Sequence, residues 1–209
     1  MSRLYNLFFI IPLIIIGCKT KEINQDTKIR QSINSLNMNI FSNEGKKYLS
    51  IKSPYSSFDK EANVLNLKET TIKLFKNNKG EYIITSEKSK LSNNNKLLEL
   101  NGNVLVRTIA NQEEKLYSNN FIWDINNSEF LLIGKVKFIN NLITLSSNKA
   151  ILNKKDNIIE FFNPVEYKFN DGNNEKRYEI KSENAYYNIN TKSVSFRSEK
   201  ERVRSKIYF

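Results

Sequence analysis

A strand–turn–strand unit of roughly 30 residues recurs along most of the chain, and a period of this length is the signature of stacked supersecondary units. The clearest copy runs from Leu116 to Phe138. The pair Asn126-Asn127 predicts a tight turn in its middle, because Asn tolerates the left-handed backbone that a hairpin needs. After the turn, apolar side chains occupy every second position, as in a strand with one buried face. These positions are Phe130, Leu132, Val136 and Phe138.

The copies share a fixed offset between a Ser and a later bulky residue. In each copy the bulky residue lies five positions after the Ser, and Asp, Asn or Ser follows it. An apolar second strand comes next, and in the middle copies an Asn or Gly leads into a further alternating run. Because all-β chains with many Asn turns look self-similar in general, the constant offset is what indicates a true repeat. The pairs are Ser53 and Phe58, Ser86 and Leu91, Ser118 and Trp123, Ser147 and Leu152, and Ser182 and Tyr187.

The predicted fold class is all-β, with two packed sheets or an open roll built from these hairpins. The alternating pattern is nearly continuous from about Tyr48 to Phe209, turns follow every ~8–12 residues, and no internal linker interrupts it. Asp171-Gly172 adds a hairpin turn signal. The chain ends on a strand-like run, Arg202–Phe209, with no helix after it. This predicts a free sheet edge at the C-terminal end.

The N-terminus has the pattern of an export signal. Arg3 supplies a positive charge and Leu7–Ile16 an apolar core, which is shorter than the ~20 residues of a membrane-spanning helix. The run Ile15-Ile16-Gly17-Cys18 resembles the bacterial lipobox, and Cys18 is the chain's single Cys. The resemblance implies a lipoprotein signal peptide over residues 1–17 and acylation of Cys18, and acyl chains anchor a protein at ~0.8 kcal/mol per buried CH₂. The alternative is an uncleaved anchor helix with an incidental Cys.

Residues 18–40 form the next segment, which is mostly polar. Ile29, Ile33, Leu36 and Ile40 are spaced three to four apart, a pattern that permits a short helix. We expect a lipidated tether instead, because nothing else in the segment would hold a helix in place. The β domain is then predicted over residues 41–209.

Composition excludes most kinds of enzyme. The chain has no His and one Cys, so His-based catalytic triads, His-ligated metals, Cys-cluster metals and internal disulfides are excluded. We therefore expect no metal, no cofactor and no catalysis. The carboxylates, among them Asp124 and Glu129, are scattered and form no recognisable two-carboxylate motif. The net charge of +11 favours anionic partners, unless it reflects a compositional bias of the source genome. Nucleic acid is not expected for an exported lipoprotein.

The apolar face of the aligned units is the candidate site. It reads either as the filled core of a β-sandwich or as an open groove for acyl chains with a charged rim. Lys88, Lys90, Lys135 and Lys137 are the candidate rim. The candidate groove residues are Leu98, Leu100, Val104, Phe121, Trp123, Phe130, Leu132, Val136, Phe138 and Phe161.

The hairpin segments resemble those of a known family. SEKSKLSNNNKLLELNGNVLV, SNNFIWDINNSEFLLIGKVKF, SSNKAILNKKDNIIEFFNPVEY and SENAYYNINTKSVSF look like the repeated hairpins of the LptC and OstA-like (LptA-related) lipopolysaccharide-transport proteins. The resemblance covers about residues 48–205 and implies an open β-jelly roll. A membrane-attached N-terminus on one domain is more like LptC, although the familiar LptC anchor is a transmembrane helix rather than a lipidated Cys.

That resemblance implies a non-enzymatic role in the periplasm, with the anchor favoured in the inner membrane. The protein would accept lipopolysaccharide, through its lipid A part, from the permeases of the inner-membrane Lpt ABC transporter and pass it to an LptA-like bridge protein, edge to edge. The partner edge would contain Arg202, Val203, Arg204 and Lys206. One alternative is a structural or adhesive lipoprotein whose core is simply filled, and another is a soluble-type OstA-like bridge segment that is tethered.

Overall fold

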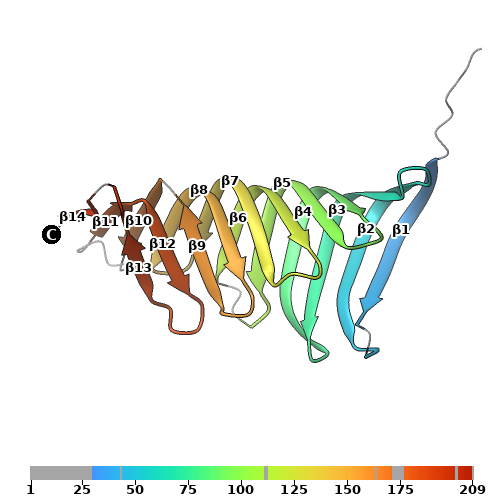
Figure 1. The fold of residues 1–209 in the computed structure, drawn as a ribbon, viewed down its shortest axis with the longest axis horizontal. Coiled ribbons are helices and arrows are strands. Elements are labelled where there is room, and N and C mark those ends of the chain that lie inside the picture. The colour runs from blue at the N-terminus through green and yellow to red at the C-terminus, as the bar shows by residue number, and fades with distance from the viewer. Residues whose placement is uncertain are drawn as a thin grey trace, which may run out of the picture.

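Every regular element in the described part of the chain is a β-strand, which confirms the predicted all-β class. The strands belong to one 14-stranded sheet that runs from β1 at one end to β14 at the other (Figure 1). The predicted signal peptide and Cys18 lie outside the described residues. The computed structural model describes residues 30–42, 44–110, 113–162, 164–170, 177–200 and 202–208.

The strand bounds show how closely the elements follow one another. In chain order the strands are β1 (Arg30–Phe41), β2 (Lys47–Asp59), β3 (Val64–Lys76), β4 (Lys79–Ser92), β5 (Leu97–Thr108), β6 (Lys115–Asp124), β7 (Glu129–Ile139), β8 (Ile143–Asn153), β9 (Ile158–Phe162), β10 (Val165–Asn170), β11 (Arg177–Ser182), β12 (Asn184–Asn188), β13 (Val194–Arg197) and β14 (Arg204–Tyr208).

The sheet is folded into two layers along a common corner. The two halves of β8 have different partners: Lys149–Asn153 pairs with β9, and Ile143–Ser146 pairs with β10. Layer I contains β9, β12, β13 and the halves of the longer strands that continue their pairing. Layer II contains β10, β11, β14 and the remaining halves. The structure is therefore an antiparallel roll, as predicted, with most strands contributing to both layers.

The repeated Ser marks this corner. Where the strands bend, the Ser hydroxyl donates a hydrogen bond to the carbonyl two residues later in every copy except that of Ser86, for example Ser118 Oγ to Asn120 O at 2.9 Å and Ser147 Oγ to Lys149 O at 2.8 Å. The neighbouring strand compensates with a bulge at Gly134, where φ is +78°. A hydroxyl that bonds locally to the backbone satisfies a carbonyl that the bend removes from the ladder. The repeat in the sequence is thus a repeat of corners.

The turns follow the predicted use of Asn with one exception. Asn77, Asn78 and Asn93 have positive φ, as expected for tight turns. The predicted turn at Asn126-Asn127 exists, but neither residue is among those with positive φ. The Asp124 side chain closes it instead by accepting a hydrogen bond from the Asn126 N–H at 3.0 Å.

The first strand corrects the predicted tether. Residues from Arg30 to Phe41 form β1 and pair along β2, so the sheet begins earlier than residue 41. The half-buried side chains are Leu36, Met38 and Ile40, which alternate with a period of two. Ser35 interrupts the alternation because its φ is +56°, and this break produced the apparent helical spacing.

The sheet ends in free edges on both sides. Among the described residues β1 pairs only with β2, β13 only with β12, and β14 only with β11. The predicted C-terminal edge at β14 is thus present, and β1 and β13 are two further edges among the described strands. No helix among the described residues has the length and hydropathy needed to cross a membrane.

Candidate functional site: the interior of the roll and its mouth

All ten predicted groove residues lie in one buried cluster between the two layers. Each is at most 2% exposed. The prediction missed the matching residues of the N-terminal strands, of which Leu49, Ile51, Ile72 and Ile84 are fully buried. The signal was available, because Leu49 and Ile51, like Ile72 and Leu74, alternate with polar neighbours in the same way.

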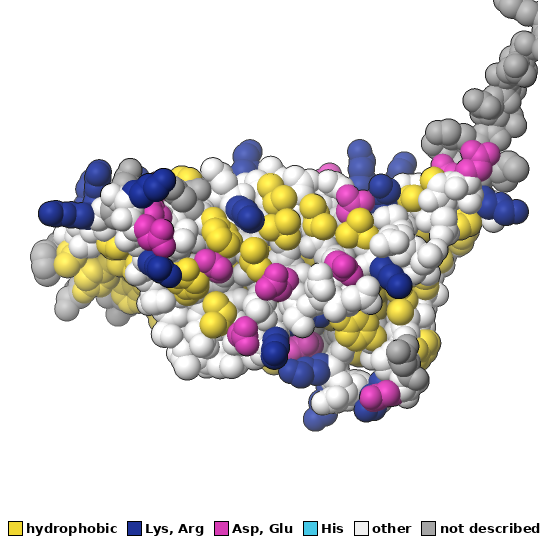
Figure 2. Space-filling view, viewed as in Figure 1, with side chains coloured by type: hydrophobic (Ala, Val, Ile, Leu, Met, Phe, Trp, Pro, Cys, Tyr) yellow, Lys and Arg dark blue, Asp and Glu magenta, His cyan; other side chains and the backbone are white. Residues whose placement is uncertain are grey.

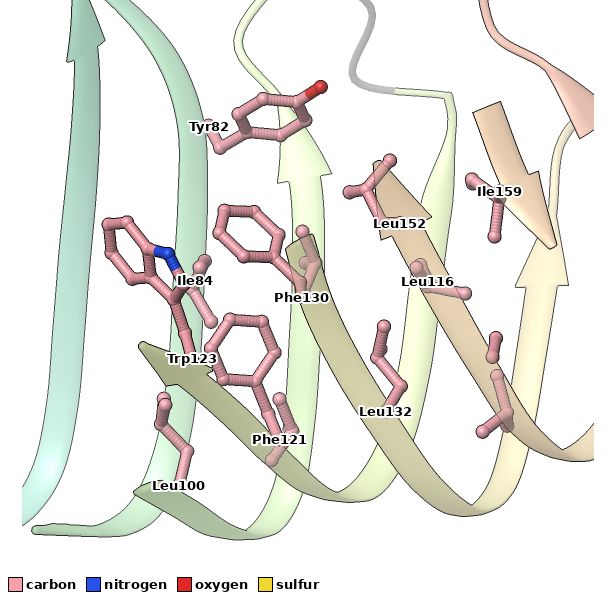
Figure 3. Packing of buried hydrophobic residues seen from close by; sticks show 14 of the residues in the cluster. Tyr82, Ile84, Leu100, Leu116, Phe121, Trp123, Phe130, Leu132, Leu152 and Ile159 are labelled. Atoms are coloured by element: carbon pink, nitrogen blue, oxygen red, sulfur yellow. The ribbon is translucent and has the colours of Figure 1, made fainter. Parts of the chain in front are cut away.

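Aromatic rings fill the middle of this interior. Phe130 packs against Phe121 and Trp123 at centroid distances of 5.1 and 5.0 Å, and against Tyr82 of layer II at 6.1 Å (Figure 3). The Trp123 indole N–H donates to Asn127 O at 3.0 Å, so its one polar atom is satisfied. The rings therefore join the two layers, and the interior is filled by side chains in this state.

The predicted lysine rim is wrong. Lys88 and Lys90 flank the inward-facing Ser89, so they lie on the outer face of β4, where Lys90 pairs with Glu99 at 3.3 Å. Lys135 and Lys137 are likewise exposed on β7. The reason is the strand period of two, which places neighbours of an inward residue outside. Lys and Arg side chains are scattered over the face of the molecule that Figure 2 shows.

The actual opening of the roll lies opposite the corner, where the turns of the two layers face each other. We call this opening the mouth. One rim consists of the layer I turns, such as β6–β7 and β8–β9, and the other of the layer II turns, such as β3–β4 and β5–β6. None of the strand pairings within the described residues joins the two rims. Between the described parts of the two rims, side-chain contacts close the mouth.

The first cross-mouth contact, which we call the Lys154 latch, joins Lys154 of layer I to Tyr48 of layer II. The Lys154 amine donates to Tyr48 Oη at 3.2 Å and lies 4.5 Å from the centre of the Trp123 ring and 4.9 Å from that of Phe130. The Tyr48 hydroxyl in turn donates to Ile125 O at 3.3 Å. Burial lowers the pKa of Lys154 to about 8, with smaller and opposing effects from Glu81 and Lys76.

The second cross-mouth contact, the Glu114 latch, joins Glu114 at the layer II rim to two residues of layer I. Glu114 accepts a hydrogen bond from Tyr187 Oη at 2.8 Å and forms an ion pair with Lys192. Glu114 is only 4% exposed, so these partners satisfy a carboxylate that would otherwise be costly to bury. Burial, together with the Glu114 hydrogen bond, raises the pKa of Tyr187.

A narrow apolar crevice reaches the interior near these latches. It is lined by Leu152 and Ile159 from one layer and by Leu116 and Phe138 from the other, and its volume is about 20 Å³. A cavity of this volume has room for about one water molecule. An acyl chain thus requires the layers to separate at the mouth. At the β1 end, Ile33 is 37% exposed.

Comparison with known proteins places the chain in a family. Residues 107–206 match the family model described as OstA-like protein, and residues 13–131 match the model described as lipopolysaccharide-assembly, LptC-related. The LptC-related match covers more than half of the chain, so the chain belongs to the LptC-related family. The resemblance drawn from the hairpins is thereby confirmed, and the protein has a role in lipopolysaccharide transport in the cell envelope.

One of the solved structures that match is LptH of Pseudomonas aeruginosa, described as the LptA homologous periplasmic component of the conserved lipopolysaccharide transport device. The two chains are 9% identical, the match covers 77% of this chain and 94% of that one, and the TM-score is 0.29. No curated protein matches the chain.

Proposed function

We propose that the protein is a non-enzymatic carrier that holds the acyl chains of lipopolysaccharide between its layers while the head group remains outside the mouth. One observation carries this proposal: the roll is closed along its mouth by side chains and not by paired strands. A head group that projects through the mouth can then slide along the roll as the latches open in turn. A backbone ladder across the mouth would block that movement, because its hydrogen bonds would have to break together.

Loading of the roll exchanges one set of apolar contacts for another. The interior is filled, so acyl chains must replace side-chain contacts between the layers as these separate about the corner. Each Å² of acyl surface removed from water contributes roughly 25 cal/mol, which offsets the lost contacts. The glycines and left-handed residues at the corner are where such a hinge would flex, because the ladder is already interrupted there.

The proposal includes a place in a transport chain. A lipidated Cys18 would hold the protein at the inner membrane, where the transporter permeases deliver lipopolysaccharide. A free sheet edge pairs with another strand through main-chain hydrogen bonds, so the edges would connect this roll to its neighbours. At the C-terminal edge, Arg204 and Lys206 are exposed on β14, with Arg202 and Val203 just before it. These charges discourage unspecific pairing.

The alternative function, a structural or adhesive lipoprotein without lipid cargo, is favoured by the same filled interior. A crevice of about 20 Å³ gives no room for a ligand in this state. Binding experiments decide between the two functions.

Titration with lipopolysaccharide tests the carrier function through Trp123, the chain's single tryptophan. We expect its fluorescence to change saturably, because the ring lies between the layers next to the Lys154 latch. Phe138→Glu should weaken binding by roughly tenfold or more, since a buried carboxylate next to acyl chains is costly. Ile133→Glu, on the outer face of the same strand, is the control and should bind normally. A flat signal from a folded wild-type chain would favour the structural function.

A further inference from the structure

The Lys154 amine lies in an aromatic environment that is unusual for a charged group. It lies among the rings of Trp123, Phe130 and Tyr48, at 4.5, 4.9 and 5.4 Å from their centres. No ion pair among the described residues includes it, whereas Lys192, the lysine of the Glu114 latch, is paired with Glu114. Cation–π contacts compensate for only part of the hydration free energy that an ammonium group loses on burial. The site thus keeps a positive charge that an apolar side chain of similar length would fill at lower cost.

We propose that Lys154 is the residue that recognises a phosphate group of the glycolipid at the mouth. This inference rests on the proposed carrier function, since it requires acyl chains inside the roll. As the chains enter, the amine would leave the aromatic rings and form a charge-assisted hydrogen bond with the phosphate outside them. The acyl chains would then occupy the ring faces that the amine covers in this structure.

The same movement would open the Lys154 latch. The amine is bonded to Tyr48 Oη across the mouth, so an amine that binds phosphate releases the contact between the two layers. Recognition of the anionic head group and opening of the roll would therefore be one event. The charged groups that face the amine are Glu81 of β4 and Lys76 of β3, and neither forms an ion pair with it.

The adjacent residue provides a matched control. Lys155 follows in the same turn and carries the same charge, but it is exposed and makes no cation–π contact with the rings. A general electrostatic attraction between a basic protein and an anionic lipid would use both lysines equally. Recognition at the mouth requires Lys154 alone.

The experiment measures equilibrium binding of radiolabelled lipid A, with its phosphates and after their enzymatic removal, to the full chain. We expect the wild type and Lys155→Gln to prefer the phosphorylated form by about tenfold, as for one charge-assisted hydrogen bond. Lys154→Gln should bind both forms equally and retain the affinity for the dephosphorylated form. Lys154→Arg should restore part of the preference.

Two results would overturn the inference about Lys154, and a third would overturn the proposed carrier function as well. Lys154→Gln with an undiminished preference shows that another group binds the phosphate. In a competition experiment, inorganic phosphate could displace the phosphorylated and the dephosphorylated lipid equally well. That result would show that the site binds the free anion and does not recognise a lipid phosphate. If the wild type binds neither form, the carrier function itself fails, and this outcome is distinct from a lost preference.

Discussion

A covalent bridge across the mouth will abolish the loading of lipopolysaccharide into the interior. Tyr48→Cys and Lys154→Cys place thiols on opposite rims, and a short bis-maleimide joins them while the protein is empty. The crevice that remains, about 20 Å³, has room for about one water molecule, so the chains need the layers to separate. The measurement is the amount of labelled lipopolysaccharide retained by the full chain before and after bridging.

Two controls separate the bridge from the substitutions. Each single cysteine variant, treated with the same reagent, should still load lipid, because its layers remain free to separate. Ser128→Cys with Lys155→Cys joins two turns of the same rim, where Lys154 N–H donates to Ser128 O at 2.8 Å, and should load as the wild type does. Normal loading of the cross-mouth bridged protein would show that lipid does not enter between the layers.

The second large effect is expected from charged substitutions on the free edge of β1, which should abolish binding of one partner protein. Strand β1 is a long edge whose body, from Gln31 to Phe41, contains no charged residue. Natural sheets protect such edges with lysines, so an unprotected edge suits a matched partner strand. Asn37→Lys together with Asn39→Lys adds two charges at exposed positions of this edge. We expect this variant to lose one of the two proposed partners, the transporter permeases or the LptA-like bridge protein, in a pull-down.

The opposite edge provides the reciprocal test. Deletion of residues 204–209 removes β14, which pairs only with β11 among the described strands, and should abolish capture of the other partner. Asn66→Lys with Asn101→Lys adds the same charge at exposed positions inside the sheet and should leave both captures unchanged. Folding of each variant is checked by circular dichroism. If both partners bind all variants equally, the bridge does not form through the sheet edges.

The sequence predicted the strands well because strand alternation is a local pattern. The Ser offset also located a real structural feature, although its role was hidden: Ser118 and Ser147 are corner residues, and a corner looks like ordinary strand in a sequence. Strand β1 was missed because the left-handed Ser35 shifts the alternation by one residue. A one-residue shift moves every later side chain to the other face.

The contacts across the mouth could not be predicted from the sequence, for a different reason. Lys154 and Tyr48 are 106 positions apart and meet only because the sheet folds at its corner. Neither residue belongs to a motif, and Lys154 stands beside Lys155 in a polar turn that is typical of a solvated loop. The predicted rim used lysines within strands, where alternation places them outside. The burial of the candidate groove residues was predicted correctly because burial follows the period of two.

The most direct test of the central claim compares two adjacent residues of β7. Leu132 is fully buried between the layers, and Ile133 is 38% exposed on the outer face. A small diazirine amino acid is introduced at one position or the other in the full chain, and the protein is irradiated with lipopolysaccharide. If the interior holds the acyl chains, a covalent lipid adduct forms at position 132 and not at position 133. An adduct at position 133 alone, or equal adducts at both positions, would contradict this account.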